Sequence, residues 1–109
     1  MQSIYRFMRL ILMFDLPMTD KEEVKIYTRF RKELINNGFV MLQYSVYVRC
    51  YPNKTSAIQG MNKIKRIVPN KGAVRAMIIT EAQYQSMAIL VGGKSFQDDN
   101  ITTKPLMVL

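Results

Sequence analysis

Residues 7–17 of the chain, FMRLILMFDLP, are nearly all apolar up to Phe14, with Arg9 as the interruption. A run of this kind is typical of a central β-strand that is covered on both faces. Pro17 ends the strand, because proline has no backbone amide to donate to a sheet. The sequence therefore predicts a buried strand over residues 7–14, at the centre of the fold.

Helical periodicity follows this strand. Residues 19–22 read TDKE, which predicts a capping box with Thr19 as the N-cap and Glu22 reaching back to its amide. Apolar side chains then recur at helical spacing until the sequence NNG, which begins at Asn36 and is typical of a helix end. We therefore expect an amphipathic helix over residues 20–37.

The rest of the sequence predicts further strands and a second helix. Residues 40–51 alternate between apolar and polar side chains over a length that allows two strand pieces. Residues 57–68 carry a second helical stripe, and residues 73–80 predict another strand. Residues 80–87 could hold one helical turn, and residues 88–91 predict a short apolar strand.

The order of these elements is that of the ferredoxin-like β-α-β-β-α-β arrangement, an α+β fold with an antiparallel sheet and both helices on one face. We expect this domain over residues 1–91, followed by a tail over residues 92–109. The other face of the sheet would be apolar and open. A second copy is its simplest cover, with Ala88–Val91 crossing to that copy, so the sequence predicts a homodimer.

The composition excludes several classes of protein. The chain has 109 residues, 49% of them apolar and 22% charged, which fits one soluble globular domain. Its longest apolar run, Leu10–Phe14, is too short for a bilayer span or a signal peptide, so we expect a cytoplasmic protein with no membrane partner. The chain has no histidine and one cysteine, Cys50, which excludes a zinc site and a Ser-His or Cys-His relay.

The charge is the most informative part of the composition. Sixteen Lys and Arg against eight Asp and Glu give +8 at pH 7. A small basic domain most often binds nucleic acid, although self-repulsion or an acidic protein partner would also account for the charge. Four cations share one arc of the first helix without an acid, so we prefer phosphate contact to a merely solvated face. The predicted phosphate contacts are Lys21, Lys25, Arg29, Arg31, Lys32, Lys63, Arg66, Lys71 and Arg75.

Asp15 is the candidate for metal chemistry, because it ends the first strand. A carboxylate there can bind a hard cation such as Mg²⁺ through one or two oxygens, with water completing the shell. The alternative is a turn aspartate that accepts hydrogen bonds from backbone amides. One carboxylate is a poor magnesium site, whereas two copies of Asp15 across a dimer axis would make a plausible one.

Three tyrosines of the second strand region, Tyr44, Tyr47 and Tyr51, could serve as base-stacking platforms. The basic-Gly-aromatic signature of RNA-recognition sheets is missing from the sequence. Packing in a core or an interface is therefore the better interpretation of all three.

Several motifs occur in a fixed order along residues 5–91. YRFMRLILMFDLP begins at Tyr5, YTRFRK begins at Tyr27, and GF and QYSVY follow between Gly38 and Tyr47. Together they resemble the CRISPR-associated Cas2 family of small adaptation proteins. The later segments PNKG and TEAQY, which begin at Pro69 and Thr80, are similar to its subtype II-A branch.

This resemblance implies a ferredoxin-like homodimer that bridges two dimers of the CRISPR integrase (Cas1), which inserts captured foreign DNA into a CRISPR array. It also implies a magnesium-dependent nuclease on RNA or double-stranded DNA, with Asp15 binding the metal at the two-fold axis. The first hypothesis is therefore a spacer-acquisition subunit that binds duplex DNA and the integrase as a scaffold. The second is a magnesium-dependent endonuclease in which Asp15 of both subunits is catalytic. The third is a ferredoxin-like RNA binder or regulator unrelated to CRISPR.

The end of the tail is a candidate for partner binding. Four apolar residues follow a polar linker there, and such a run is expected to dock on a partner subunit as an added strand or an apolar plug. A frayed terminus is the alternative. The residues concerned are Leu106, Met107, Val108 and Leu109.

Overall fold

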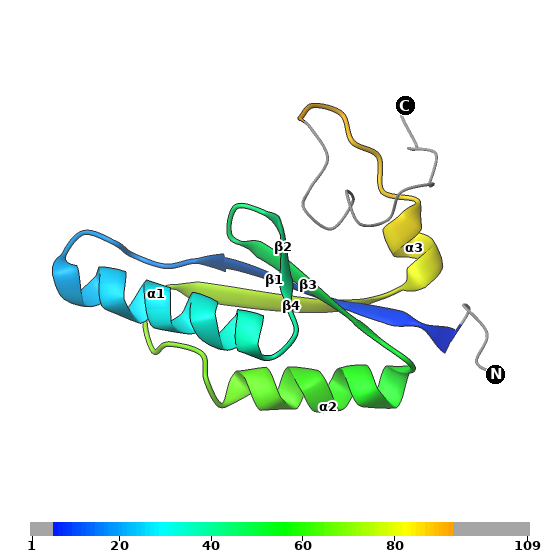
Figure 1. The fold of residues 1–109 in the computed structure, drawn as a ribbon, viewed down its shortest axis with the longest axis horizontal. Helices are drawn as coiled ribbons and strands as arrows, with labels where there is room; N and C mark the ends of the chain where they lie inside the picture. Colours follow the sequence, from blue (N-terminus) through cyan, green and yellow to red (C-terminus); the bar gives the residue numbers. More distant parts are fainter. Residues whose placement is uncertain (1–5, 93–109) are drawn as a thin grey trace.

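The computed structural model describes residues 6–92, which form a four-stranded antiparallel sheet and three helices. The sheet order is β2-β3-β1-β4, and α1 and α2 lie on one side of it, with α3 on the other (Figure 1). The ferredoxin-like α+β prediction is therefore confirmed. The elements are β1 (Met8–Asp15), α1 (Lys21–Asn36), β2 (Val40–Gln43), β3 (Val46–Tyr51), α2 (Lys54–Lys65), β4 (Ala73–Thr80) and α3 (Glu81–Gln85).

β1 is the central strand that the sequence predicts. It pairs with β3 on one side and with β4 on the other, both antiparallel. Because successive side chains of a strand point to opposite faces, β1 supplies both layers of the molecule. Leu10, Leu12 and Phe14 are buried under α1 and α2, and Ile11 is buried on the opposite face.

The start of α1 corrects the predicted capping box by one residue. Asp20 is the N-cap, and its carboxylate accepts a hydrogen bond from the Glu23 amide at 2.8 Å. The Glu23 carboxylate in turn accepts from the amide and the hydroxyl of Thr19, at 2.9 and 2.6 Å. These bonds from Thr19 hold the pKa of Glu23 below its ordinary value. Thr19 and Glu22 were the predicted pair, but the charge of Asp20 suits the positive end of the helix better than a hydroxyl does.

The residues after α1 form two strands, as predicted, and these strands make a hairpin. β2 and β3 are joined through Tyr44 and Ser45, and a bulge between Met41 and Gln43 shifts their register. Ser45 adopts a left-handed backbone with φ of 62°. Its carbonyl accepts a hydrogen bond from the Phe14 amide at 3.1 Å. The hairpin turn is therefore fixed against the end of β1.

The second helix begins and ends earlier than the apolar stripe over residues 57–68 suggests. Asn53 is its N-cap, with a side chain that accepts from the Ser56 amide, and Arg66 is its C-cap. The first turn of α2 is polar, which is why apolar spacing does not reveal it. β4 occupies residues 73–80 as predicted, and α3 provides the predicted turn within residues 80–87.

Within the described single chain, residues Ala88–Val91 form no strand, and their predicted crossing to a second copy stays a prediction. α3 follows β4 without a loop, through a capping box of Thr80 and Gln83, and carries the chain away from the sheet. A strand needs a neighbouring edge, and this path does not return along the outer edge of β4. Val91 consequently remains 94% exposed.

Two other predictions concern a membrane span and the C-terminal tail. Among residues 6–92, no helix has the length and apolar character that crossing a bilayer requires. The proposed docking residues Leu106, Met107, Val108 and Leu109, with all but the first residue of the predicted tail, lie outside the described residues.

Candidate functional site

The face of the sheet opposite α1 and α2 is the first candidate surface. We call it the open face. β1 contributes Arg9, Ile11, Met13 and Asp15 to it, by alternation along the strand. The register adds partners on both sides. These are Cys50, Val48 and Val46 on β3, and Ile79, Met77, Arg75 and Ala73 on β4.

α3 covers one end of the open face. Tyr84 is buried against Ile11 and Val48, which form a second small core with it. Towards the other end the described residues leave the face more exposed, since Met13 and Met77 are 37% and 47% exposed. The open face is thus closed at the Arg9 end and accessible at the end where β1 finishes.

A buried ion pair holds α3 on the sheet. Arg9 donates from Nε to Glu81 Oε1 at 2.6 Å and from Nη2 to Oε2 at 3.0 Å. The Arg9 guanidinium also lies 4.1 Å from the centre of the Tyr84 ring, and Gln85 donates to Glu81 at 2.6 Å. Burial lowers the pKa of Arg9, but the hydrogen bonds and charge of Glu81 outweigh it and raise this pKa. We call this group the α3 clamp.

The sequence hypotheses missed the α3 clamp. Arg9 was interpreted only as an interruption of an apolar strand, and Glu81 as part of a family motif. A charged residue inside a strand buried on both faces has to find a partner, because an unpaired buried charge is costly. The need of Arg9 for a partner of opposite charge could therefore have been predicted from the sequence. It could not identify Glu81 as the partner, because the two residues are 72 positions apart.

Asp15 lies at the accessible end of the open face, with its side chain exposed. The backbone on either side of it is fixed by its neighbours. The Phe14 amide is bonded to Ser45, and Gly72 approaches so closely that a Cβ there would lie 2.5 Å from the Asp15 carbonyl oxygen. Gly72 also has φ of 80°, which disfavours any other residue. Asp15 is therefore a carboxylate presented on a rigid support.

The described part of one chain offers Asp15 no cluster of further carboxylate, thiol or imidazole ligands for a metal ion. Among residues 6–92, no three His, Cys, Asp or Glu side chains come together in a way that could hold a metal ion. The Cys50 thiol is a poor metal ligand in its neutral form, and burial raises the pKa of Cys50 and so favours that form. A single exposed carboxylate is nevertheless compatible with Mg²⁺, which keeps several waters and often takes only one or two carboxylates together with phosphate oxygens.

The structure divides the predicted phosphate contacts between two faces. Lys21, Lys25, Arg29 and Lys32 are exposed on α1, as the arc predicts, and Lys63 and Arg66 are exposed at the end of α2. These residues belong to the helical side of the molecule. Arg75 does not join them, because it lies on the open face opposite Met13. We call the exposed cations of α1 and α2 the basic helical surface.

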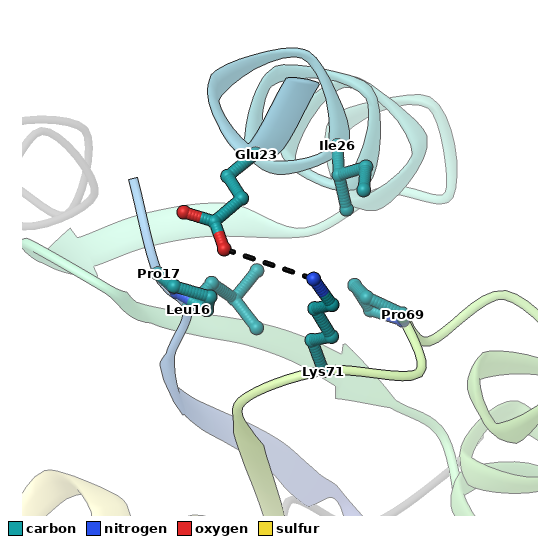
Figure 2. A pocket seen from close by; sticks show the side chains of 6 residues that line it. All are labelled: Leu16, Pro17, Glu23, Ile26, Pro69 and Lys71. Atoms are coloured by element: carbon teal, nitrogen blue, oxygen red, sulfur yellow. Dashed lines mark ion pairs between the residues drawn. The ribbon is translucent and has the colours of Figure 1, made fainter. Parts of the chain in front are cut away.

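Two of the predicted contacts have protein partners. Arg31 donates from Nε to the Tyr47 hydroxyl at 2.8 Å while its side chain stays exposed. Figure 2 shows Lys71 at a shallow pocket between the start of α1 and the loop before β4, where its ammonium faces the Glu23 carboxylate at 3.9 Å. Lys71 is therefore partly neutralised within the chain. The lining residues are Leu16, Pro17, Glu23, Ile26, Pro69 and Lys71.

The three tyrosines have different environments. Tyr47 and Tyr51 are buried in the core, as the packing interpretation predicts. Tyr44 is not, because its side chain is 68% exposed at the hairpin turn. Core packing is therefore wrong for Tyr44, whereas its packing in an interface stays a prediction.

Fold and surface together define a class: a small, basic ferredoxin-like protein with an exposed carboxylate where its central strand ends. The family follows from comparison with known sequences. The family model described as CRISPR associated protein Cas2 matches residues 8–87, and the chain belongs to this family. The hypothesis of a regulator unrelated to CRISPR is thereby excluded.

Several relatives match over most of their length. The chain is 52% identical over 87 residues to the CRISPR-associated endoribonuclease Cas2 of Ligilactobacillus salivarius, covering 80% of this chain and 86% of that protein. It is 43% identical over 101 residues to the protein of the same name from Lacticaseibacillus rhamnosus, covering 93% and 100%. A third such protein, from Treponema denticola, is 38% identical over 102 residues, covering 94% and 100%.

The α3 clamp generates a stability prediction. Glu81→Gln leaves the Arg9 charge buried without its counterion, so the free energy of unfolding should fall by about 3–5 kcal/mol. The double variant Arg9→Met with Glu81→Leu removes both charges and should recover most of that loss. Urea unfolding followed by circular dichroism, at one protein concentration, measures both.

The matched control is Glu22→Gln, which removes an exposed carboxylate from the first turn of α1 and should cost less than about 1 kcal/mol. If Glu81→Gln cost no more than this control, the pair would not be what holds α3 on the sheet.

Proposed function

We propose that this chain is a magnesium-dependent endoribonuclease of a CRISPR system, with Asp15 as its metal ligand. The observation that carries the proposal is the rigidly supported, exposed carboxylate at the end of β1. The relatives from L. salivarius and L. rhamnosus are both named CRISPR-associated endoribonuclease. Such a protein would act in the prokaryotic cytoplasm.

The proposed active form is a homodimer that meets through the open face. Met13 and Met77 form the exposed apolar part of that face, next to Asp15. In a two-fold interface each patch contacts its own counterpart, so burying Met13 and Met77 would bring two copies of Asp15 towards the same axis. Two carboxylates from two chains would then supply the ligands that residues 6–92 of one chain do not bring together.

The residues of the dimer have defined tasks in this proposal. Bound magnesium would supply positive charge against the phosphate and orient a water. The two Asp15 carboxylates would hold the metal, and the close approach of Gly72 and the Phe14–Ser45 hydrogen bond keep the backbone at each Asp15 fixed. Arg75, on the same face, supplies a cation for phosphate oxygens near the metal.

A second role is favoured by the charge distribution. The basic helical surface lies on the side of the sheet opposite Asp15, so it remains free when two open faces meet. We propose that it binds the phosphates of duplex DNA, with the dimer bridging the CRISPR integrase during spacer acquisition. Contacts of this kind position a duplex and carry no sequence information.

The nuclease proposal predicts the effect of Asp15→Asn. This change keeps the shape of the side chain and removes the charge that attracts the metal, so magnesium-dependent RNA cleavage should fall by at least about 100-fold. Binding of duplex DNA should stay within about two-fold, because the basic helical surface is untouched. Gel assays of cleavage, with magnesium or with a chelator, and fluorescence anisotropy measure the two effects.

Asp20→Asn is the matched control, because asparagine caps a helix as well as aspartate does. This variant should cleave like the wild type. Cleavage that survives both the chelator and Asp15→Asn would remove Asp15 from the mechanism and leave the scaffold role as the better proposal.

The dimer proposal predicts that Met77→Asp gives monomers. A carboxylate at this position would have to be buried in the interface without a partner, which is costly. Sedimentation at micromolar concentration should show a dimer for the wild type. Met41→Asp is the control, since Met41 is similarly exposed at 41% but belongs to the other face of the sheet. A monomeric wild type would contradict the proposal.

The DNA proposal predicts a strong dependence on salt. The slope of log affinity against log salt should be near −0.9 for each phosphate neutralised. Lys25→Ala or Arg29→Ala should each flatten it by about one unit, whereas Lys71→Ala should flatten it less, because Lys71 already faces Glu23. A scrambled duplex should bind equally well. Anisotropy titrations measure the slope for the wild type and for each of the three variants, and the affinity for the scrambled duplex. Unchanged slopes in every variant would show that the DNA binds to another surface.

A further inference from the structure

Tyr44 is an aromatic side chain that the core does not use. Among residues 6–92 it is the one tyrosine whose side chain is exposed, and it sits at the turn between β2 and β3. A single exposed aromatic residue is common on protein surfaces and carries no conclusion by itself. What distinguishes Tyr44 is how it is held and what surrounds it.

The Tyr44 ring is the outer member of a column of aromatic rings. It stacks on Tyr27, with the ring centres 6.5 Å apart and the planes inclined by 27°. Tyr27 contacts Phe14 at 6.0 Å, and Phe14 stacks on the buried Tyr47 at 5.6 Å. Hydrogen bonding with Tyr27 also raises the pKa of Tyr44 above its ordinary value. The inner side of Tyr44 is therefore occupied by protein, and its outer side is accessible.

The backbone of the turn is also fixed. Ser45, the next residue, has the left-handed φ of 62° and accepts the hydrogen bond from Phe14. A ligand that stacked on Tyr44 would not have to order the loop first, which is the cost that weakens many flexible sites. The same hydrogen bond places the turn beside the end of β1, where Asp15 follows Phe14.

Positive charge lies next to this column. Arg31 is one helical turn after Tyr27 on the same side of α1, and its guanidinium is oriented by the Tyr47 hydroxyl. Glu23, one turn before Tyr27, is engaged by Thr19 and Lys71. A flat apolar ring beside an oriented cation suits a nucleotide, which has a flat base and a charged phosphate.

We infer that Tyr44, supported by Tyr27, is a stacking platform for an unpaired base of single-stranded nucleic acid, with Arg31 contacting a neighbouring phosphate. Bases inside a duplex already stack on each other, so a single strand is the ligand that can offer a free face. The inference rests on the proposed function. It deepens that proposal, because it assigns the residues that would hold an unpaired base of the RNA beside the Asp15 end of the sheet.

The experiment compares two probes on the full-length protein. One is a single-stranded RNA oligonucleotide that contains 2-aminopurine, whose fluorescence is quenched by stacking. The other is a linear DNA duplex long enough that its ends are a negligible share of its binding sites. Affinities are measured at the same salt concentration for the wild type, Tyr44→Ala and Tyr44→Phe. Met41→Ala, an exposed change on the same hairpin, is the matched control.

Tyr44→Ala should weaken binding of the single strand by about 5- to 150-fold and abolish the quenching. Replacing one aromatic stacking residue by alanine typically weakens the binding of a base by about this factor. Tyr44→Phe keeps the ring and should retain both affinity and quenching, as should Met41→Ala. Duplex affinity should not change in any variant.

Three results would overturn the inference. Wild-type affinity and quenching in Tyr44→Ala would show that no base stacks there. An equal loss of affinity for both probes would show general damage or a protein-surface role in place of stacking. A wild type that binds neither probe would overturn the proposed function as well, whereas the first two results leave that function standing.

Discussion

The double burial of β1 is the constraint on which the rest of the structure depends. Its even-numbered side chains, Leu10, Leu12 and Phe14, need two helices above them, and its odd-numbered ones face a second layer. The helical layer is complete within one chain. The second layer is completed by α3 at one end only, through Arg9 and Glu81, and the proposed interface between copies is located where that cover stops. Asp15 is the last residue of the same strand, so the strand that organises the core also positions the candidate metal ligand.

Sequence patterns predicted the fold well because each pattern reports a local property. The strand predicted over residues 73–80 matches β4 to the residue, and helical spacing with the NNG sequence identified the end of α1. The errors occur where a distant partner decides the outcome. Ala88–Val91 forms no strand within one chain, because α3 is tied to Arg9 and directs the described chain away from the sheet edge, so its pairing with a second copy stays a prediction. Thr19 and Asp20 are both good caps, and one residue of register separates the two solutions.

The candidate site also combines features that local sequence patterns predict with features that depend on distant parts of the chain. The position of Asp15 at a strand end was predictable, because a proline two residues later ends the strand. The basic arc of α1 was predictable from helical geometry, yet the separation of Arg75 from that arc depends on the sheet register. Alternation alone would place Tyr44 and Tyr47 on opposite faces of one strand, but it could not predict that Tyr44 lies in the turn between β2 and β3, where it is exposed. A pattern gives the face of a strand, whereas a bulge changes it.

The outer edge of β4 affects how the protein behaves in concentrated solution. β4 is an end strand of the four-stranded sheet, and it is an eight-residue strand of sequence AVRAMIIT. An unpaired edge of this kind offers a ready template for joining other sheets into fibrils or precipitates. Its one charge is Arg75, close to the middle of the strand. Because a charged side chain on an edge strand opposes edge-to-edge pairing, we expect Arg75 to favour solubility independently of any ligand.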